Sequence, residues 1–159
     1  MIKVLIAEAH PIVRQGLQDL LQETGEIVIA GEANCGMEVL KSISQADYDL
    51  VLLDISLPGG GGPEILRQLK REKPDLNVLI LGTYPEEQYA VRVLKEGAAG
   101  YLAKERAPEE LLTAIQKIAL GEKYVSSSLA GKFVFDWKAR LPKPEVYEVL
   151  SEKLDTFVG

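Results

Sequence analysis

Short apolar runs alternate along this chain with longer stretches in which apolar residues recur at helical spacing. The apolar runs predict strands at residues 3–7, 27–30, 50–53, 78–81 and 101–103. Apolar stripes with the period of a helix follow them, within residues 13–21, 36–43, 65–69, 90–94 and 111–119. The run from Leu50 to Leu53 contains no polar residue, which is typical of a strand buried on both faces.

Five strand-then-helix units predict an α/β fold, in which a parallel sheet is covered on both faces and the crossovers are right-handed. A dinucleotide-binding sheet is the alternative topology, but it requires a Gly-x-Gly-x-x-Gly turn after the first strand. Here that turn reads Glu8-Ala9-His10-Pro11, which disfavours the alternative. We therefore expect a doubly wound sheet; if its strand order is 2-1-3-4-5, the order reverses between the first and third strands.

The five units end near residue 124, and the rest of the chain has a different pattern. Residues 125–159 carry two further helical stripes, with the segment Leu141-Pro142-Lys143-Pro144 between them. We expect one α/β domain at residues 1–124 and a helical extension at residues 125–159.

The amino-acid composition of the chain limits the classes of partner that it is expected to bind. The chain has 18 Lys and Arg against 24 Asp and Glu, and this formal charge of −6 disfavours binding of nucleic acid or an anionic membrane by this chain alone. Its apolar runs are far shorter than the roughly 20 residues that a membrane-spanning helix needs. Cys35 is the single cysteine, and the N-terminus lacks the layout of a signal peptide, so a cytoplasmic location is expected.

Charged residues follow three of the predicted strands. Glu8 comes after the first strand, Asp54 ends the third and Lys104 follows the fifth. In an open parallel sheet, ligands bind outside the carboxyl ends of the strands, where the strand order reverses. An acid at one strand end is most often simply solvated, but two carboxylates with a lysine suit a divalent cation and a phosphoryl group.

The motifs around these residues resemble those of response-regulator receiver domains, in particular the NarL/FixJ type with a LuxR-like helix-turn-helix output. The resemblance covers roughly residues 2–135. It is carried by Val4-Leu5-Ile6-Ala7 before His10-Pro11, by Leu52-Leu53-Asp54 before Pro58-Gly59, by Gly100-Tyr101-Leu102-Ala103-Lys104 and by Pro108-Glu109-Glu110-Leu111-Leu112. It implies a flavodoxin-like fold of five strands in the order 2-1-3-4-5.

The resemblance also implies roles for individual residues. Asp54 matches the phosphoacceptor, which receives a phosphoryl group from a sensor histidine kinase, and Lys104 matches the lysine that pairs with the phosphoryl oxygens. Glu8, Asp54 and the backbone carbonyl of Ser56 match the Mg²⁺ site. Tyr101 matches the aromatic residue whose inward or outward rotamer reports phosphorylation. Such a domain accepts a phosphoryl group but is not an enzyme in the usual sense.

Two positions depart from the family pattern. Ala9 stands where the family usually has a second acid after the first strand, and its methyl group leaves Mg²⁺ with two carboxylates instead of three. Gly82 stands at the end of the fourth strand, where the family has a Ser or Thr hydroxyl. Thr83 is one residue later, and the alternation of side chains along a strand points it away from the site.

We therefore expect the phosphorylatable receiver of a two-component regulator of transcription. Its DNA contacts are expected in a C-terminal domain outside this chain, and a homodimer is a further expectation. Ala9 and Gly82 favour an alternative, a pseudo-receiver that binds partners without being phosphorylated. A flavin-binding protein is a third interpretation, disfavoured by the lack of a hydroxyl-rich phosphate loop. His10, the single histidine, is interpreted as a residue before a helix-opening proline because no Cys or His partner for a metal accompanies it.

Overall fold

The protein is a three-layer α/β sandwich. The computed structural model describes residues 1–59, 62–83 and 86–125. Its strands are β1 (Ile2–Ala7), β2 (Ile27–Ala33), β3 (Leu50–Asp54), β4 (Asn77–Gly82) and β5 (Gly100–Ala103). Its helices are α1 (Pro11–Gln22), α2 (Gly36–Gln45), α3 (Gly62–Glu72), α4 (Glu86–Lys95), the short 3-10 helix η1 (Lys104–Arg106) and α5 (Ala107–Ala119).

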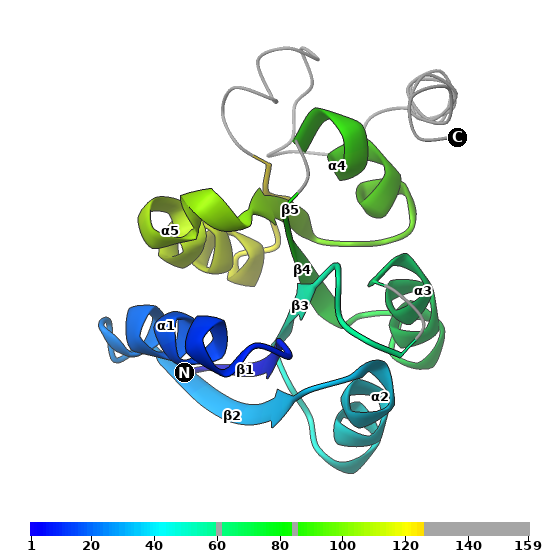
Figure 1. Ribbon diagram of the computed structural model, residues 1–159, viewed down its shortest axis with the longest axis horizontal. Helices are drawn as coiled ribbons and strands as arrows, with labels where there is room; N and C mark the ends of the chain where they lie inside the picture. The colour runs from blue at the N-terminus through cyan, green and yellow to red at the C-terminus, as the bar shows by residue number, and fades with distance from the viewer. Residues whose placement is uncertain (60–61, 84–85, 126–159) are drawn as a thin grey trace.

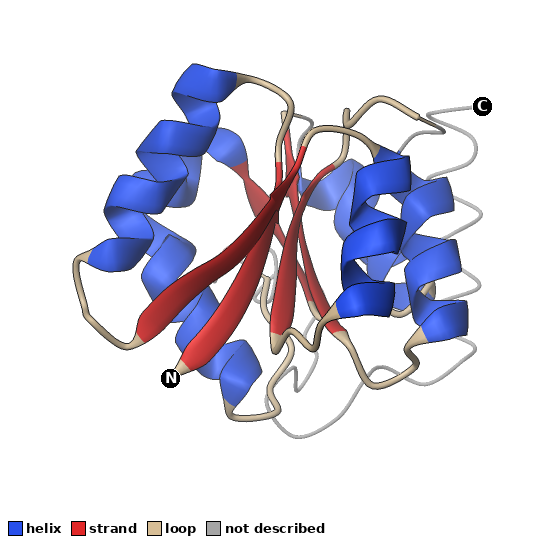
Figure 2. Cartoon of the chain, turned by 90° about the horizontal axis from the view of Figure 1, so that it is seen from below, coloured by secondary structure: helices blue, strands red, loops and turns tan. Residues whose placement is uncertain are grey.

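The sheet has the predicted topology. Its strand order is β2-β1-β3-β4-β5, and every neighbouring pair is parallel. Helices α1 and α5 cover one face, whereas α2, α3 and α4 cover the other (Figures 1 and 2). The strand order reverses between β1 and β3, so the ends of these two strands meet at the edge where ligands of such sheets bind.

The apolar pattern of β3 explains its central position. All five of its residues are buried, and alternate side chains enter opposite layers of the core. Leu50 and Leu52 belong to the apolar cluster beneath α1 and α5. Val51 and Leu53 belong to the cluster beneath α2, α3 and α4. A strand that lies between two helical layers needs apolar side chains on both faces, as the unbroken run predicts.

The bounds of β2 and α3 depart from the prediction for reasons that the structure shows. Strand β2 continues past residue 30 to Ala33, because an irregularity opposite Val4 and Leu5 lets the pairing resume from Gly31. Its polar residue Glu32 remains exposed because β2 is an edge strand. Helix α3 begins at Gly62, so Pro63 lies in its first turn instead of in the loop before it. Proline is tolerated there because the first N–H groups of a helix have no partner inside it.

The chain after α5 returns to the sheet at β5. The N–H of Tyr124 donates to the Ala99 carbonyl at 2.9 Å, and the N–H of Tyr101 donates to the Tyr124 carbonyl at 3.1 Å. Val125 is buried in the cluster beneath α2, α3 and α4. This segment covers part of the edge of β5. Beyond Val125, the predicted helical extension lies outside the described residues.

Candidate functional site

Two carboxylates are buried together at the carboxyl end of the sheet. The pairing of Ala7 with Leu53 places Glu8 beside Asp54, the last residue of β3. Their side chains are only 1% and 2% exposed. Burying two like charges is costly unless a partner compensates them, so this pair requires a cation nearby.

Lys104 supplies a positive charge from the end of β5. Its Nζ lies 3.1 Å from Oδ2 of Asp54 and 3.2 Å from Oε2 of Glu8. The lysine side chain keeps 20% of its surface exposed, so it reaches the two acids from the solvent side. The structure thus brings together the three charged residues that the strand ends predicted.

Ser56 holds the Asp54 carboxylate from the other side. Its backbone N–H donates to Oδ1 of Asp54 at 3.1 Å, and its hydroxyl lies 3.0 Å from both carboxylate oxygens. Burial alone would raise the pKa of Asp54, but the hydrogen bond from the Ser56 N–H, a side-chain hydrogen bond with Glu8 and the Lys104 ammonium together lower that pKa below its ordinary value of 3.8. Asp54 is therefore an ionised, oriented carboxylate at neutral pH. Sequence reasoning assigned Ser56 only a backbone carbonyl and missed its N–H and hydroxyl.

His10 lies in this site, although the sequence interpretation set it aside. It occupies the N-cap position of α1 without a side-chain capping hydrogen bond, and its Nδ1 lies 3.0 Å from Oε1 of Glu8. One ligand atom from each of Glu8, His10 and Asp54 lies within 4.8 Å of the others. The signal that could have identified His10 is a carboxylate partner, Glu8, two residues before it in the sequence. Two carboxylates and an imidazole form a donor set that fits a divalent cation.

The two departures from the family pattern have structural consequences. Ala9 is partly buried and packs against the apolar cluster beneath α2, α3 and α4, so it offers no ligand to a cation. Thr83 is exposed just beyond β4, whereas Gly82 is buried at the strand end. The hydroxyl of Thr83 is therefore not buried at the site, as the alternation of side chains predicts.

The side chain of Tyr101 points into the core. It is the largest fully buried side chain among the described residues, and it belongs to the cluster beneath α2, α3 and α4. A Cβ atom built on Gly82 would overlap the Tyr101 hydroxyl and would lie 2.9 Å from Cζ of the ring. The ring of Tyr101 therefore occupies space that only a glycine at position 82 leaves open.

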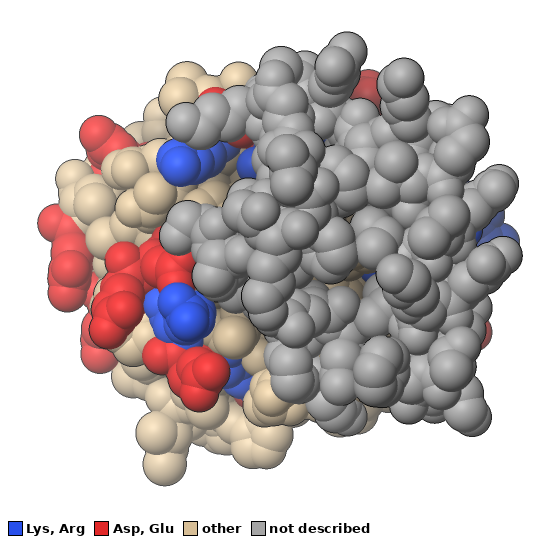
Figure 3. All heavy atoms as spheres, turned by 90° about the horizontal axis from the view of Figure 1, so that it is seen from above, with Lys and Arg blue, Asp and Glu red and all other residues tan. Residues whose placement is uncertain are grey.

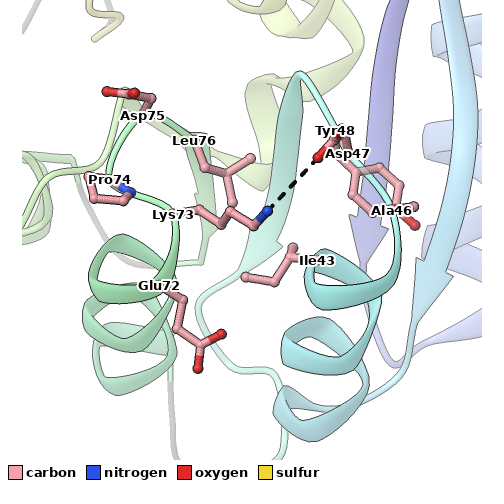
Figure 4. A pocket seen from close by; sticks show the side chains of 9 residues that line it. All are labelled: Ile43, Ala46, Asp47, Tyr48, Glu72, Lys73, Pro74, Asp75 and Leu76. Atoms are coloured by element: carbon pink, nitrogen blue, oxygen red, sulfur yellow. Dashed lines mark ion pairs between the residues drawn. The ribbon is translucent and has the colours of Figure 1, made fainter.

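A pocket of about 340 Å³ lies at the opposite end of the sheet from Asp54. It is lined by the segments that precede β3 and β4, and Lys73 points across it toward Asp47, 3.9 Å away (Figure 4). The exposed ion pair that spans it is weak, because water screens both charges. The pocket has no contact with the carboxylate site.

Charges of both signs share the described part of the molecular surface. Acidic side chains surround a smaller number of basic ones on the described part of the face in Figure 3, in keeping with the formal charge of −6. In the described part of the chain, no helix is both long enough and apolar enough to cross a bilayer.

The sequence and the fold are similar to those of known regulators. Residues 4–116 match the response regulator receiver domain. The chain is 37% identical to the response regulator UvrY of Escherichia coli strain K12 and 36% identical to GacA of Pseudomonas aeruginosa strain PAO1, each over 130 residues. Both alignments cover 82% of this chain. The chain spans about three fifths of the length of these relatives, 60% and 61%.

Solved structures give the same result. A two-component response regulator of the LuxR family from Aurantimonas sp. SI85-9A1 superposes with a TM-score of 0.78 at 28% identity, over 82% of this chain and 94% of that one. The receiver domain of the putative regulator NarL from Mycobacterium tuberculosis superposes with a TM-score of 0.70 at 28% identity, over 76% and 97%. The chain therefore belongs to the response regulator receiver family and is a receiver domain of the UvrY, GacA and NarL type of two-component regulator.

Proposed function

We propose that this receiver takes a phosphoryl group on Asp54. The environment of the Asp54 carboxylate supports the proposal. This carboxylate is ionised, accepts a hydrogen bond from the Ser56 N–H and lies 3.1 Å from the Lys104 ammonium. A nucleophilic carboxylate must be deprotonated and oriented, and a nearby cation must offset the charge that develops on the transferred group.

The transfer would run from a phosphohistidine of a sensor kinase or from an acyl phosphate. An oxygen of Asp54 forms the new bond to phosphorus as the bond from phosphorus to the donor breaks. The leaving imidazole or acetate keeps the electron pair of that bond, and the imidazole then takes a proton. Lys104 pairs with the phosphoryl oxygens. Glu8, Asp54 and the Ser56 carbonyl would hold Mg²⁺, which supplies further neutralisation of the phosphoryl charge.

We assign the domain to a longer regulator of transcription, on the basis of relatives that this chain matches over about three fifths of their length. Its expected partner is a sensor histidine kinase. A homodimer and DNA contacts made by another domain belong to the same proposal. They are supported by RcsB, which is 26% identical to this chain and has been solved as two dimers bound to two parallel DNAs.

Intact-mass measurement tests the phosphoacceptor role. The chain is incubated with acetyl phosphate and Mg²⁺ and is measured at once, beside an Asp54→Asn variant. One phosphoryl group on the native chain and none on the variant is the expected result. A native chain that gains no phosphoryl group with Mg²⁺ or Mn²⁺ would contradict the proposal.

A pseudo-receiver is the second candidate, and two residues favour it. Ala9 removes an acid next to Glu8, and Gly82 removes a hydroxyl-bearing side chain at the end of β4. On this alternative the domain binds its partners with Asp54 unmodified, so an Asp54→Asn variant would keep native partner binding. The mass measurement separates the two candidates, because only the first requires a covalent adduct.

A further inference from the structure

The ring of Tyr101 occupies the space that a side chain at position 82 would need. The end of β4 pairs with β5 through Gly82 and Ala103, and Tyr101 lies two residues before Ala103. A Cβ at position 82 would overlap the Tyr101 hydroxyl and would stand 2.9 Å from Cζ and 3.1 Å from Cε2. Real Cβ atoms essentially never come within 3.0 Å of such neighbours, so a side chain at position 82 would require the ring of Tyr101 or the backbone to shift.

The ring of Tyr101 lies in an apolar region. It belongs to the same buried cluster as Ala90 and Val91 of α4 and Val125. The backbone N–H of Tyr101 donates to the Tyr124 carbonyl at 3.1 Å, so the segment that contains Val125 is attached beside the backbone of Tyr101. Tyr101 could leave the core only by breaking this packing and exposing its apolar ring.

Nothing at position 82 can take the place of a departing ring. Gly82 has no side chain to rotate, so an outward movement of Tyr101 would leave a cavity at the end of β4, which close-packed cores disfavour. A serine or threonine at this position could fill that space. With glycine, the buried position of Tyr101 does not depend on any movement of residue 82.

We propose that Gly82 fixes Tyr101 in the buried position whatever occupies Asp54, so that the carboxyl ends of β4 and β5 keep one conformation. This inference goes beyond the proposed function, since it holds with or without phosphorylation. Any partner that binds at the carboxyl ends of β4 and β5 would then contact the same surface whether Asp54 is unmodified or phosphorylated. Phosphorylation, where it occurs, would act through other parts of the domain.

Fluorine NMR of the chain labelled with 3-fluorotyrosine tests the proposal. The chain has six tyrosines, and a Tyr101→Phe variant identifies the signal of Tyr101. A gadolinium chelate broadens the signals of exposed rings. We expect the Tyr101 signal to resist broadening, and to keep its position when beryllium trifluoride and Mg²⁺ are added. Bound beryllium trifluoride is visible in the same spectrum, which reports separately on Asp54 and so on the proposed function.

Substitution at position 82 gives a second arm that needs no ligand at Asp54. Gly82→Ala should expose Tyr101 and increase the broadening of its signal several-fold. Gly16→Ala is the matched control, because a Cβ on Gly16 meets nothing within 4 Å. Where Gly82→Ala alone unfolds, a Tyr101→Leu substitution added to it removes the overlapping atoms and should restore folding.

Two results would overturn the proposal. One is a native Tyr101 signal that broadens or moves as beryllium trifluoride binds. The other is a folded Gly82→Ala variant in which Tyr101 remains as shielded as in the native chain. If beryllium trifluoride does not bind, the phosphoacceptor role loses support, and the glycine variants still decide whether position 82 holds the ring.

Discussion

The Nζ atom of Lys104 lies 3.1 Å from Oδ2 of Asp54, at a point where the same ammonium group also faces Glu8 at 3.2 Å. One cation therefore compensates two carboxylates that are almost completely buried. Removing it would leave two like charges beside each other in a region of low polarity. The lysine thus contributes to the stability of the fold as well as to the proposed phosphoryl chemistry.

Replacing Lys104 by methionine should destabilise the protein. We expect a loss of about 1–3 kcal/mol, below the range for a fully buried pair, because Lys104 itself is partly solvated. Urea unfolding at neutral pH in the presence of a chelator measures the change. Lys73→Met is the control: its ion pair with Asp47 is exposed, so no measurable change is expected. Equal losses in the two variants would show that Lys104 makes no special electrostatic contribution.

The lowered pKa of Asp54 predicts how stability depends on pH. Because its pKa is lower in the folded state than in the unfolded state, the unfolded chain binds more protons as the pH falls through this range. The contribution of Asp54 to stability is therefore complete above the ordinary pKa of 3.8 and is lost as the pH falls through the folded value. We expect the stability of the metal-free native chain to fall more steeply below about pH 4 than that of Asp54→Asn. Parallel acid-unfolding curves for the two chains would refute the assignment.

Two helical glycines should respond to alanine with opposite signs. A Cβ on Gly62 would lie 2.6 Å from both Cα and the carbonyl oxygen of Ile55, which are backbone atoms that cannot rotate away. We expect Gly62→Ala to cost about 1–3 kcal/mol. Gly16 lies within α1 with open space around it, so Gly16→Ala should stabilise the chain by about 0.5–1 kcal/mol. Thermal unfolding of both variants measures the two changes in stability. A Gly62→Ala variant that is more stable than the native chain would show that the backbone of Ile55 leaves room for a Cβ at position 62.

The fold could be predicted because its signal is local and repeated. An unbroken apolar run such as Leu50 to Leu53 and the helical stripes around it determine which faces are buried, and the parallel topology then places Glu8 next to Asp54. Family motifs supplied the roles of Asp54 and Lys104, and the structure brings those residues into contact.

The features that escaped prediction depend on the direction of single side chains in three dimensions. The hydroxyl of Ser56 turns back onto Asp54, and the ring of His10 turns toward Glu8 from the start of α1. The overlap between position 82 and Tyr101 joins two strands through their packing. A linear pattern records the type of residue at each position, but it does not record these directions.

The imidazole of His10 provides a direct report on metal binding. His10 is the single histidine of the chain, so its ring gives one set of NMR signals when the protein is prepared without a histidine tag. Because Nδ1 lies 3.0 Å from Glu8, a cation held between Glu8 and Asp54 should shift these signals. Imidazole suits Zn²⁺, whereas Mg²⁺ prefers oxygen ligands, so we expect Zn²⁺ to shift them at lower concentration than Mg²⁺. If neither metal shifts the ring signals of His10, a cation site between Glu8 and Asp54 is contradicted.

Restoring an acid at position 9 should favour Mg²⁺. Ala9 contributes only a methyl group beside Glu8, whereas Ala9→Asp would add a carboxylate, the ligand that Mg²⁺ prefers. We expect this variant to bind Mg²⁺ about tenfold more tightly, which corresponds to about 1.4 kcal/mol. Ala9→Asn is the matched control because it has a similar shape without the charge, and it should gain much less. Titration of the His10 signals with Mg²⁺ measures all three chains. If Ala9→Asp binds Mg²⁺ no more tightly than Ala9→Asn, the missing acid does not limit metal binding in this receiver.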